Sequence, residues 1–529
     1  MQSFSSPRGF HSRCVKAAIA ALGALLLPCV ALAQVPDALP DNTTSTGGTY
    51  PLWFGFGREA QHAAPAPVAS QPFTRIKWQT PVDLNPQYSG SELLIHYGSP
   101  MTTLYDKVIV PVKTGATDGF EIVALNNTDG STIYTLPTDY TLPPHNWTPS
   151  YGPTLAPGDK LYYPGAGGTV YLRTHASSAS GTVTQLAFYG LSNYQANPSA
   201  YNSTVYICTP LTVDGKGNIY FGYVVTGSNP INLTGGLARI SSTGVGSFVT
   251  ASAATGDSNM SQVQYNSAPA VTSDGSIVYA AFTNGNYGYL LGLSGSTLAT
   301  VYPTTQFTNP TPLKDPLTGY DAYTVNDGTS SPAIGYNGDV FFGVLENPFG
   351  YNHLRGWMLH FDKTLATVKT PGAFGWDDTA SIVPKSAVPS YTGTSPYLIM
   401  TKYNNYIEGG GDGKNKIAVL DPRATETDPV SGATVMKEIL TMVGPTPDPR
   451  QSGSYKEWCI NSATVDSYTK SILANSEDGK LYRWDLTTNT LSEVMTLTAG
   501  LGEAYTPTVV GGDGTIYAIN NAILFAVGK

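Results

Sequence analysis

Acidic and aromatic side chains recur in the short segments that precede a repeated strand pattern. Trp376-Asp377-Asp378 and Glu457-Trp458-Cys459 are the densest of these segments. Carboxylates accept hydrogen bonds from ligand hydroxyls, and aromatic rings offer faces on which a sugar or a planar quinone can stack. Adjacent carboxylates also need solvent or a cation, because burying two unpaired charges is costly. These residues are therefore candidates for contact with a polar ligand or a metal ion.

The same position in the other repeats carries comparable side chains. The candidate ligand-binding residues are His96, His145, Trp147, Tyr151, Trp376, Asp377, Asp378, Glu457, Trp458, Glu503 and Tyr505. Charged residues make up only 12% of the chain, so a concentration of carboxylates is informative. Two alternatives stay open: the aromatic residues could simply fill the fold, and two of the carboxylates could form a glycosidase pair. The pattern assigns no catalytic residue and no metal ligand.

A glycine-rich segment, YNNYIEGGGDGKNK at 403–416, is a weaker candidate. Asn405, Glu408 and Asp412 are oxygen ligands of the kind that calcium prefers, but their spacing is not that of an EF-hand. A solvated loop is the alternative interpretation. ENPFGYNHLRG at 346–356 is expected to add His353 and Arg355 to the same rim.

A strand repeat must position these segments. A proline with small neighbours, a few apolar residues, an Asp-Gly or Asn-Gly turn and an alternating apolar run recur, as in SPAIGYNGDVFFGV (331–344) and APAVTSDGSIVYAAF (268–282). Eight such units follow one another, mostly about 45 to 65 residues apart, and each has room for four short strands. This pattern predicts an all-β, eight-bladed β-propeller of four-stranded antiparallel blades, with seven blades as the alternative.

The last unit has only three strands, and RIKWQT at 75–80 is expected to supply the fourth and close the ring. The predicted organisation is a signal peptide at 1–33, an N-terminal arm at 34–70 and one propeller domain at 71–529. In a propeller the chain crosses from the outer strand of one blade to the inner strand of the next on one face. The candidate residues should therefore gather at the mouth of the central channel.

The turns between first and second strands are expected on the opposite face. Their glycines should take positive φ, a conformation that glycine adopts without strain. The turns assigned in this way are Asp214-Gly215, Asp274-Gly275, Asn337-Gly338, Asp478-Gly479 and Asp513-Gly514.

YPLWFGFGREAQHAA at 50–64, followed by RIKW, resembles the WPxxGxxxxHTG opening of pyrroloquinoline-quinone-type propeller repeat proteins. The DG-x-[IV]-Y strands resemble the repeats of that quinoprotein-dehydrogenase-like group. For its dehydrogenases the resemblance implies a quinone, a calcium ion, an Asp base and a disulfide between adjacent cysteines. This chain has no adjacent cysteines, and no Asp aligns as the base. Pyrroloquinoline quinone and calcium therefore stay open as cofactors without a specific motif.

The N-terminus predicts export. Arg8, Arg13 and Lys16 precede an apolar run that ends in Ala31-Leu32-Ala33, which is typical of a secretory signal peptide cleaved before Gln34. A retained anchor is the alternative. We expect a periplasmic or secreted monomer with no transmembrane segment after cleavage. The net charge of the full chain, −9, argues against nucleic acid as a partner.

Cys208 and Cys459 remain after cleavage and belong to the third and seventh repeats. Eight blades would place them across the channel from each other, farther apart than the Cα separation of about 7 Å that a disulfide tolerates. We therefore predict two thiols and no disulfide.

Three functions fit these features, and whether the protein is an enzyme stays open. The favoured function is a module that binds a carbohydrate or a protein partner at the channel mouth. The alternatives are a quinone- or calcium-dependent oxidoreductase of sugars or alcohols, and a polysaccharide lyase or hydrolase.

Overall fold

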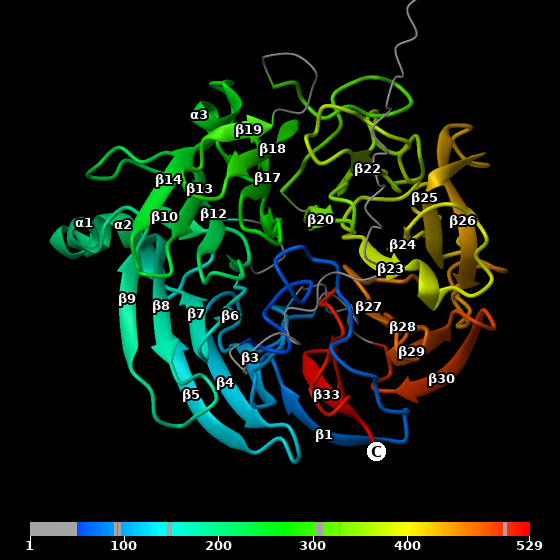
Figure 1. The fold of residues 1–529 in the computed structure, drawn as a ribbon, viewed down its shortest axis with the longest axis horizontal. Helices are drawn as coiled ribbons and strands as arrows, with labels where there is room; N and C mark the ends of the chain where they lie inside the picture. The colour runs from blue at the N-terminus through cyan, green and yellow to red at the C-terminus, as the bar shows by residue number, and fades with distance from the viewer. Residues whose placement is uncertain are drawn as a thin grey trace, which may run out of the picture. The chain divides into compact units, whose positions relative to one another are not determined.

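Eight antiparallel sheets, here called blades, surround a central axis in the computed structural model (Figure 1). The structure describes residues 50–88, 93, 97–144, 151–302, 310–326, 328–500 and 505–529. The chain divides into two compact units, Met1–Val35 and Pro36–Lys529, and all described residues belong to the second. The prediction of eight blades is confirmed, and the alternative of seven is wrong.

Four blades consist of four consecutive strands, ordered from the axis outward. Blade 1 comprises β2 (Met101–Thr102), β3 (Lys107–Lys113), β4 (Phe120–Asn126) and β5 (Thr132–Thr138). Blade 2 comprises β6 (Thr154–Ala156), β7 (Lys160–Pro164), β8 (Thr169–Thr174) and β9 (Val183–Ala187). Blade 6 comprises β23 (Ser381–Pro384), β24 (Tyr397–Lys402), β25 (Lys416–Thr427) and β26 (Thr434–Val443). Blade 7 comprises β27 (Thr464–Asp466), β28 (Ser471–Asn475), β29 (Lys480–Asp485) and β30 (Thr490–Thr496).

Blades 3 and 4 have an inner strand that is split into two pieces. Blade 3 comprises β10 (Val205–Ile207), β11 (Thr212–Val213), β12 (Ile219–Val225), β13 (Gly236–Ile240) and β14 (Gly246–Thr250). Blade 4 comprises β15 (Gln262–Val263), β16 (Ala270–Val271), β17 (Ile277–Thr283), β18 (Gly288–Ser294) and β19 (Thr300–Tyr302). In each blade both pieces pair with the same second strand, so the four-strand plan is kept.

Blade 5 departs from the plan, with three strands: β20 (Ala333–Ile334), β21 (Val340–Val344) and β22 (Trp357–Phe361). Two isolated bridges, Met358–Gly372 and Phe361–Val368, occupy the position of its outer strand. The helices are short: η1 (Ala166–Gly168), α1 (Leu191–Ala196), α2 (Pro198–Asn202), α3 (Ala251–Thr255) and η2 (Lys385–Ala387). Among the described residues, none of the helices has the length and apolar character needed to span a bilayer.

Blade 8 closes the ring with a strand from the other end of the propeller, as predicted. β1 (Arg75–Pro81) pairs antiparallel with the last strand, β33 (Ile523–Gly528), and β32 (Ile516–Asn520) and β31 (Val509–Val510) complete the sheet. The register runs from Arg75 opposite Gly528 to Pro81 opposite Ile523. Pairing the first and last strands satisfies backbone groups that would otherwise be left open at an edge.

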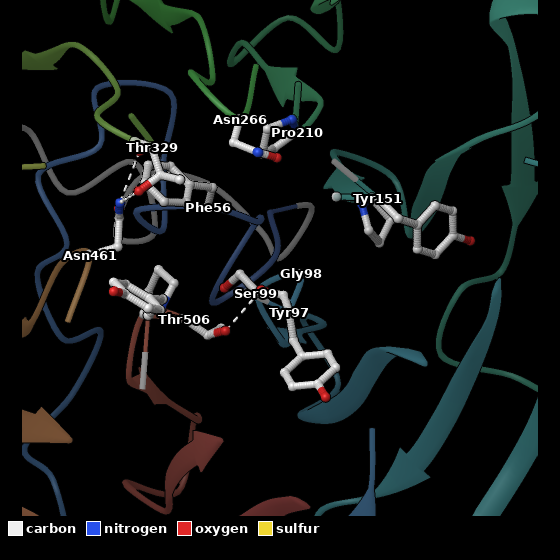
Figure 2. Close-up of a pocket in the computed structure, with 14 residues that line it drawn as sticks. Phe56, Tyr97, Gly98, Ser99, Tyr151, Pro210, Asn266, Thr329, Asn461 and Thr506 are labelled. Atoms are coloured by element: carbon white, nitrogen blue, oxygen red, sulfur yellow. Dashed lines mark hydrogen bonds between the residues drawn. The ribbon is translucent and has the colours of Figure 1, made fainter. Parts of the chain in front are cut away.

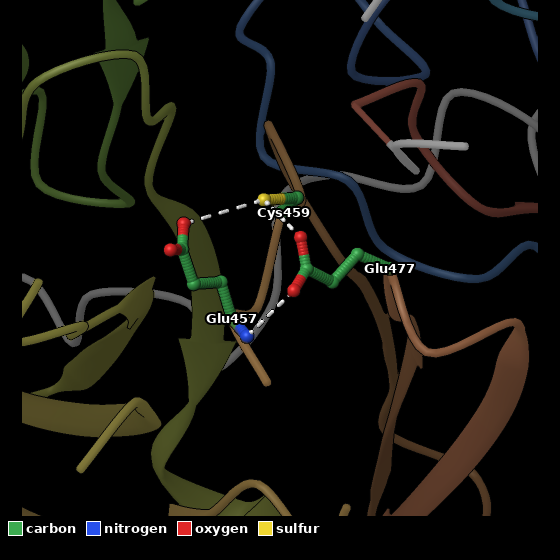
Figure 3. Close-up of side chains that lie close together, drawn as sticks. All are labelled: Glu457, Cys459 and Glu477. Atoms are coloured by element: carbon green, nitrogen blue, oxygen red, sulfur yellow. Dashed lines mark hydrogen bonds between the residues drawn. The ribbon is translucent and has the colours of Figure 1, made fainter. Parts of the chain in front are cut away.

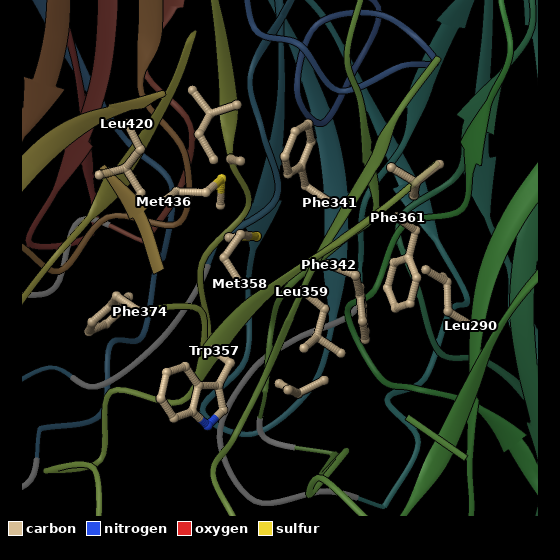
Figure 4. Packing of buried hydrophobic residues seen from close by; sticks show 14 of the residues in the cluster. Leu290, Phe341, Phe342, Trp357, Met358, Leu359, Phe361, Phe374, Leu420 and Met436 are labelled. Atoms are coloured by element: carbon tan, nitrogen blue, oxygen red, sulfur yellow. The ribbon is translucent and has the colours of Figure 1, made fainter. Parts of the chain in front are cut away.

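Burial explains the difference between inner and outer strands. Every residue of β21 (VFFGV) is buried, because both faces of a blade are covered by its neighbours near the axis. The outer strand β30 alternates between exposed and partly buried residues. Figure 4 shows the apolar contacts of the middle blades, where Phe341, Phe342 and Trp357 of blade 5 meet Leu290 of blade 4 and Leu420 of blade 6.

The N-terminal arm, described from residue 50, passes through the middle of the ring (Figure 1). Its backbone pairs with successive inner strands around the axis. Trp53 exchanges hydrogen bonds with Thr102, Phe54 O accepts from Leu155 N (2.7 Å), and Ala60 O accepts from Val271 N (2.7 Å).

The same pattern continues around the ring. Gln61 O, Ala63 O and Ala64 O accept from the inner strands of blades 5, 6 and 7 at 2.9, 3.0 and 2.9 Å, and Gln71 N donates to Gly514 O of blade 8 at 2.8 Å. In blade 3 the contact is a side-chain bond from Tyr50 Oη to Gly215 O (3.3 Å). The arm therefore joins all eight blades and fills the channel from within.

Two turn assignments are corrected. Asp478-Gly479 joins β28 to β29, so it lies on the mouth face; the first turn of blade 7 is at Tyr468–Lys470, where Lys470 has positive φ. In blade 3 the glycine with positive φ is Gly217 and not Gly215. An Asp-Gly pair predicts a tight turn, but the strands it joins depend on the register of the whole blade.

Candidate functional site

The mouth is the face that carries the crossings between blades and the turns between second and third strands. Four of the candidate residues, His96, His145, Trp147 and Glu503, lie outside the described residues. The described candidates fall into three groups: the carboxylates of blade 6, the carboxylate of blade 7, and aromatic side chains on the crossings into blades 2, 6, 7 and 8.

A buried ion pair lies beneath the crossing into blade 6. Lys402, the last residue of β24, places Nζ 2.7 Å from Asp377 Oδ1, and their side chains are 0% and 3% exposed. Asp378, the next residue, is also buried. Lys402 is therefore the cation that the adjacent carboxylates require.

Hydrogen bonding at this trio is incomplete. Asp378 Oδ2 has no hydrogen-bond partner among the described residues, and Lys402 Nζ has no acceptor there besides the ion-paired Asp377. The ammonium is flanked instead by the rings of Tyr505 and Phe374, with centroids 5.2 and 5.6 Å away. Buried polar groups in native proteins usually have partners, so this trio stands out.

Blade 1 contains a matched pair that is fully bonded. Lys113 ends β3 as Lys402 ends β24, and Asp83 lies on the crossing into blade 1 as Asp377 lies on the crossing into blade 6. Lys113 Nζ contacts both Asp83 oxygens (3.2 and 3.0 Å) and Asn85 O (3.3 Å), and Tyr97 Oη donates to Asp83 (2.9 Å). A buried Lys–Asp strut thus occurs in two blades, and the pair in blade 6 lacks the additional hydrogen bonds that the pair in blade 1 makes.

Burial changes the protonation of the trio. Burial raises the pKa of Asp378 to about 8, against the lowering effect of the Lys402 charge. Burial alone would lower the pKa of Lys402, but the charge of Asp377 outweighs it and raises that pKa. At neutral pH Asp378 is thus largely a neutral acid, which can donate as well as accept a hydrogen bond.

Asn461 connects this trio to the neighbouring crossings. Its Nδ2 donates to Thr329 O (2.9 Å) and to Asp377 O (3.2 Å), and its N–H donates to Tyr505 O (3.2 Å). Crossings into blades 5, 6 and 8 are therefore tied to one residue on the crossing into blade 7, by its side chain and its backbone. Sequence analysis did not single out Asn461.

A small cavity of about 40 Å³ lies where the crossings meet the arm (Figure 2). Phe56 of the arm lines it together with Tyr97, Tyr151, Asn461 and Tyr505. Thr506 Oγ1 donates to Tyr97 O at 2.8 Å beside it. Its volume is enough for a few water molecules.

Blade 7 brings a thiol between two carboxylates (Figure 3). Cys459 Sγ lies 3.4 Å from Glu477 Oε2 and 3.8 Å from Glu457 Oε2. Burial, together with the charge of Glu477, raises the pKa of Glu457 to about 7. Glu477 lies in the turn that was assigned to the wrong face, so sequence analysis missed it.

The aromatic candidates differ in their exposure. Trp376 is half-buried at the mouth and lies against Gly356, where an added Cβ would come within 2.9 Å of the tryptophan Cβ. Trp458 is buried in the core and meets Tyr482 edge-on at 5.4 Å. Tyr151 is buried and stacked on Phe120 at 4.7 Å. Of the two described candidate tryptophans, Trp376 is partly exposed and Trp458 is buried.

The glycine-rich turn of blade 6 is bonded to protein groups. Asp412 Oδ1 accepts from Asn405 Nδ2 (2.7 Å), Asn405 Oδ1 lies 2.7 Å from His353 Nδ1, and Glu408 pairs with Arg450. Arg355, expected on the rim, is buried and paired with Asp428 at 2.6 Å. That expectation is wrong, because the charge of Arg355 is satisfied within the fold.

Cys208 and Cys459 are both buried, and the structure places no disulfide between them, as predicted. Burial raises the pKa of the Cys208 thiol. Cys208 lies between the two pieces of the inner strand of blade 3, and Cys459 lies on the crossing into blade 7, four blades away.

No protein-family model matches this chain, and no curated protein matches it. Among solved structures, it is similar to the quinohemoprotein alcohol dehydrogenase ADHIIG from Pseudomonas putida HK5 (TM-score 0.49, 11% identity, 91% of this chain and 76% of that chain). It is also similar to Sqt1 of Saccharomyces cerevisiae (0.48, 10%, 87% and 99%) and to the computationally designed protein Ika8 (0.44, 11%, 87% and 100%). At these values the comparisons assign neither a ligand nor a reaction to this chain.

Proposed function

We propose that this chain is an exported ligand-binding propeller, with its site at the mouth beside blade 6. The ligand is a neutral polar molecule such as a carbohydrate, which stacks on Trp376 and places a hydroxyl group toward Asp378. The observation that carries the proposal is the contrast between the two Lys–Asp struts. Blade 1 satisfies its pair with protein atoms, whereas blade 6 keeps a buried acid with an unbonded oxygen, two residues after a partly exposed tryptophan.

The chemistry of the site favours a hydroxyl-bearing ligand. A neutral Asp378 offers both a donor and an acceptor, which matches a hydroxyl group better than it matches a fixed charge. The indole of Trp376 suits the apolar face of a sugar ring. Export is supported by the signal-like segment at 1–33, and it predicts that the mature protein begins at Gln34.

A quinone cofactor does not fit the described residues at the axis. Pockets for ligands of that size usually enclose about 300 to 1,000 Å³. The cavity at the crossings measures about 40 Å³, and Phe56 of the arm occupies the adjoining space. Binding therefore ranks above quinone-dependent oxidation as the proposed function.

The test is a glycan array probed with the mature chain, followed by titration calorimetry on each neutral oligosaccharide that binds. We expect binding without turnover, weakened at least tenfold in Trp376→Ala and less in Trp376→Phe, which retains a ring. Asp83→Asn, in the fully bonded strut, is the matched control and should bind normally.

The other outcomes decide between the alternatives. Cleaved oligosaccharide would favour the hydrolase or lyase. Dye reduction after addition of pyrroloquinoline quinone and calcium would favour the oxidoreductase. Binding that is equal in Trp376→Ala and the unaltered chain would overturn the proposed site.

A further inference from the structure

Three donor atoms of blade 7 converge at spacings that suit a metal ion (Figure 3). Glu457 Oε2, Cys459 Sγ and a Glu477 oxygen all lie within 4.8 Å of one another. Zinc bonds of about 2.3 Å to sulfur and 2.0 to 2.2 Å to oxygen, at tetrahedral angles, put ligand atoms about 3.5 Å apart. The observed sulfur–oxygen separations, 3.4 and 3.8 Å, bracket that value.

Each carboxylate is anchored by its other oxygen. Glu477 Oε1 accepts from Glu457 N (3.0 Å), and Glu457 Oε1 accepts from Arg450 Nη2 (3.1 Å). Both Oε2 atoms are thereby directed at the sulfur. Such outer contacts orient metal-binding side chains in established sites.

Tyr406 gives an independent indication of a missing partner. Its hydroxyl accepts a long bond from Asn404 Nδ2 (3.4 Å), and its proton has no acceptor among the described residues. Tyr406 is only 8% exposed. Asn404 also donates to Trp458 O (3.3 Å) and accepts from Trp458 N (3.4 Å), so the Tyr406 hydroxyl is linked to the segment that carries Glu457 and Cys459.

We propose that Glu457, Cys459 and Glu477 bind a divalent cation of zinc type, with a fourth position left for water or a ligand group near Tyr406. A thiolate donor selects zinc, cobalt or cadmium over magnesium and calcium. On binding, the metal–sulfur bond forms as the Cys459 S–H bond breaks, and the proton leaves to solvent. No electron is transferred.

The surrounding charges are compatible with a cation. Arg450, Lys456 and Lys402 face the cluster, but Arg450 is shared with Glu408 and Asp448, and Lys402 is paired with Asp377. Lys456 reaches Glu477 at only 3.9 Å. Five carboxylates, those of Asp377, Glu408, Asp448, Glu457 and Glu477, outnumber the three bases, so a bound dication lowers the net negative charge of this region.

The site is tested by titrating chelator-treated full-length protein with Co²⁺ alone and recording the thiolate-to-cobalt charge-transfer absorption. We expect one equivalent to bind, with the strong visible bands of tetrahedral cobalt, and Zn²⁺ to abolish the signal while Mg²⁺ does not. Cys459→Ser should lose the charge-transfer band, and Glu477→Gln should weaken binding at least tenfold. Cys208→Ser, the matched control, should keep both the charge-transfer band and the affinity for Co²⁺.

An absent charge-transfer band would overturn the proposal. So would a band that persists in Cys459→Ser, or unchanged affinity in Glu477→Gln. Weak binding of several equivalents that ignores all these substitutions would identify an adventitious ion only and would also overturn it. Circular dichroism checks that each variant is folded. If Cys459→Ser does not fold, Glu477→Gln still tests the site, because glutamine has nearly the same shape as glutamate. This test is independent of glycan binding.

Discussion

Lys402 Nζ and Asp377 Oδ1 lie 2.7 Å apart in surroundings that leave the lysine side chain with no exposed surface. The lysine belongs to the second strand of blade 6, and the aspartate belongs to the crossing that leads into the first strand. A charge pair taken fully out of water gains its attraction only after a large cost of desolvation. The burial of each charge, that of Lys402 and that of Asp377, therefore depends strongly on the presence of the other.

Lys402→Met should destabilise the protein by about 3 to 5 kcal/mol, because it leaves Asp377 buried without its cation. The measurement is the free energy of unfolding in urea. Lys113→Met in blade 1 serves as the reference and should cost a similar amount. A loss below about 1 kcal/mol in Lys402→Met, within the usual range of surface substitutions, would show that Asp377 is not a buried charge.

Asp378 should make stability fall as the pH rises. Its pKa in the folded protein is about 8, above the unfolded value, so the native state holds the extra proton between the two. The contribution of this proton to the free energy of unfolding is complete below about pH 4 and is lost as the pH approaches 8. The free energy of unfolding falls by up to about 1.4 kcal/mol per pH unit in this range.

The test compares unfolding free energies of the unaltered chain and Asp378→Asn from pH 5 to pH 8. The free energy of unfolding of the unaltered chain should fall relative to that of Asp378→Asn as the pH rises, because the amide resembles the protonated acid and cannot titrate. Parallel curves for the two proteins would mean that Asp378 is ionised throughout this range.

The arm should act as part of the ring. Trp53 is fully buried and packs with residues of blades 1 and 8, so Trp53→Ala should cost about 3 to 5 kcal/mol of stability. Tyr320→Ala removes an aromatic residue that is 60% exposed and should cost less than about 0.5 kcal/mol. Chemical denaturation checks both, and equal midpoints would show that the arm is dispensable.

The ring itself was predictable because every blade repeats the same local requirements. A proline near the start of the inner strand, a short apolar strand and a tight turn recur in units such as 331–344 and 268–282. Pairing of β1 with β33 followed from the missing fourth strand of the last unit. Asp377 and Asp378 could be placed at the mouth for the same topological reason.

The partners of these residues could not be predicted. Lys402 ends the strand YLIMTK, where a lysine would ordinarily reach solvent, and its burial depends on how two segments of blade 6 meet. Glu477 was hidden by a turn sequence that looks the same on either face. The path of the arm rests on backbone hydrogen bonds, which leave little trace in side-chain identity.

The two thiols give a further test of the architecture. Alkylation of the chain from Gln34 onward, unfolded and unreduced, should add two groups, one each at Cys208 and Cys459, because these residues lie in blades 3 and 7, four blades apart. Mass spectrometry of the digested protein measures both. Protein in which neither residue is alkylated until a reductant is added would contain the disulfide that the ring forbids.

The account depends most on a ligand at the mouth beside Trp376 and Asp378. Native mass spectrometry of the protein, purified from its own cells without denaturation, measures this binding most directly. We predict a bound neutral molecule that is present in the unaltered protein and in Asp83→Asn and absent from Trp376→Ala. A bound mass that survives in Trp376→Ala, or no bound mass in any of the three, would contradict the account.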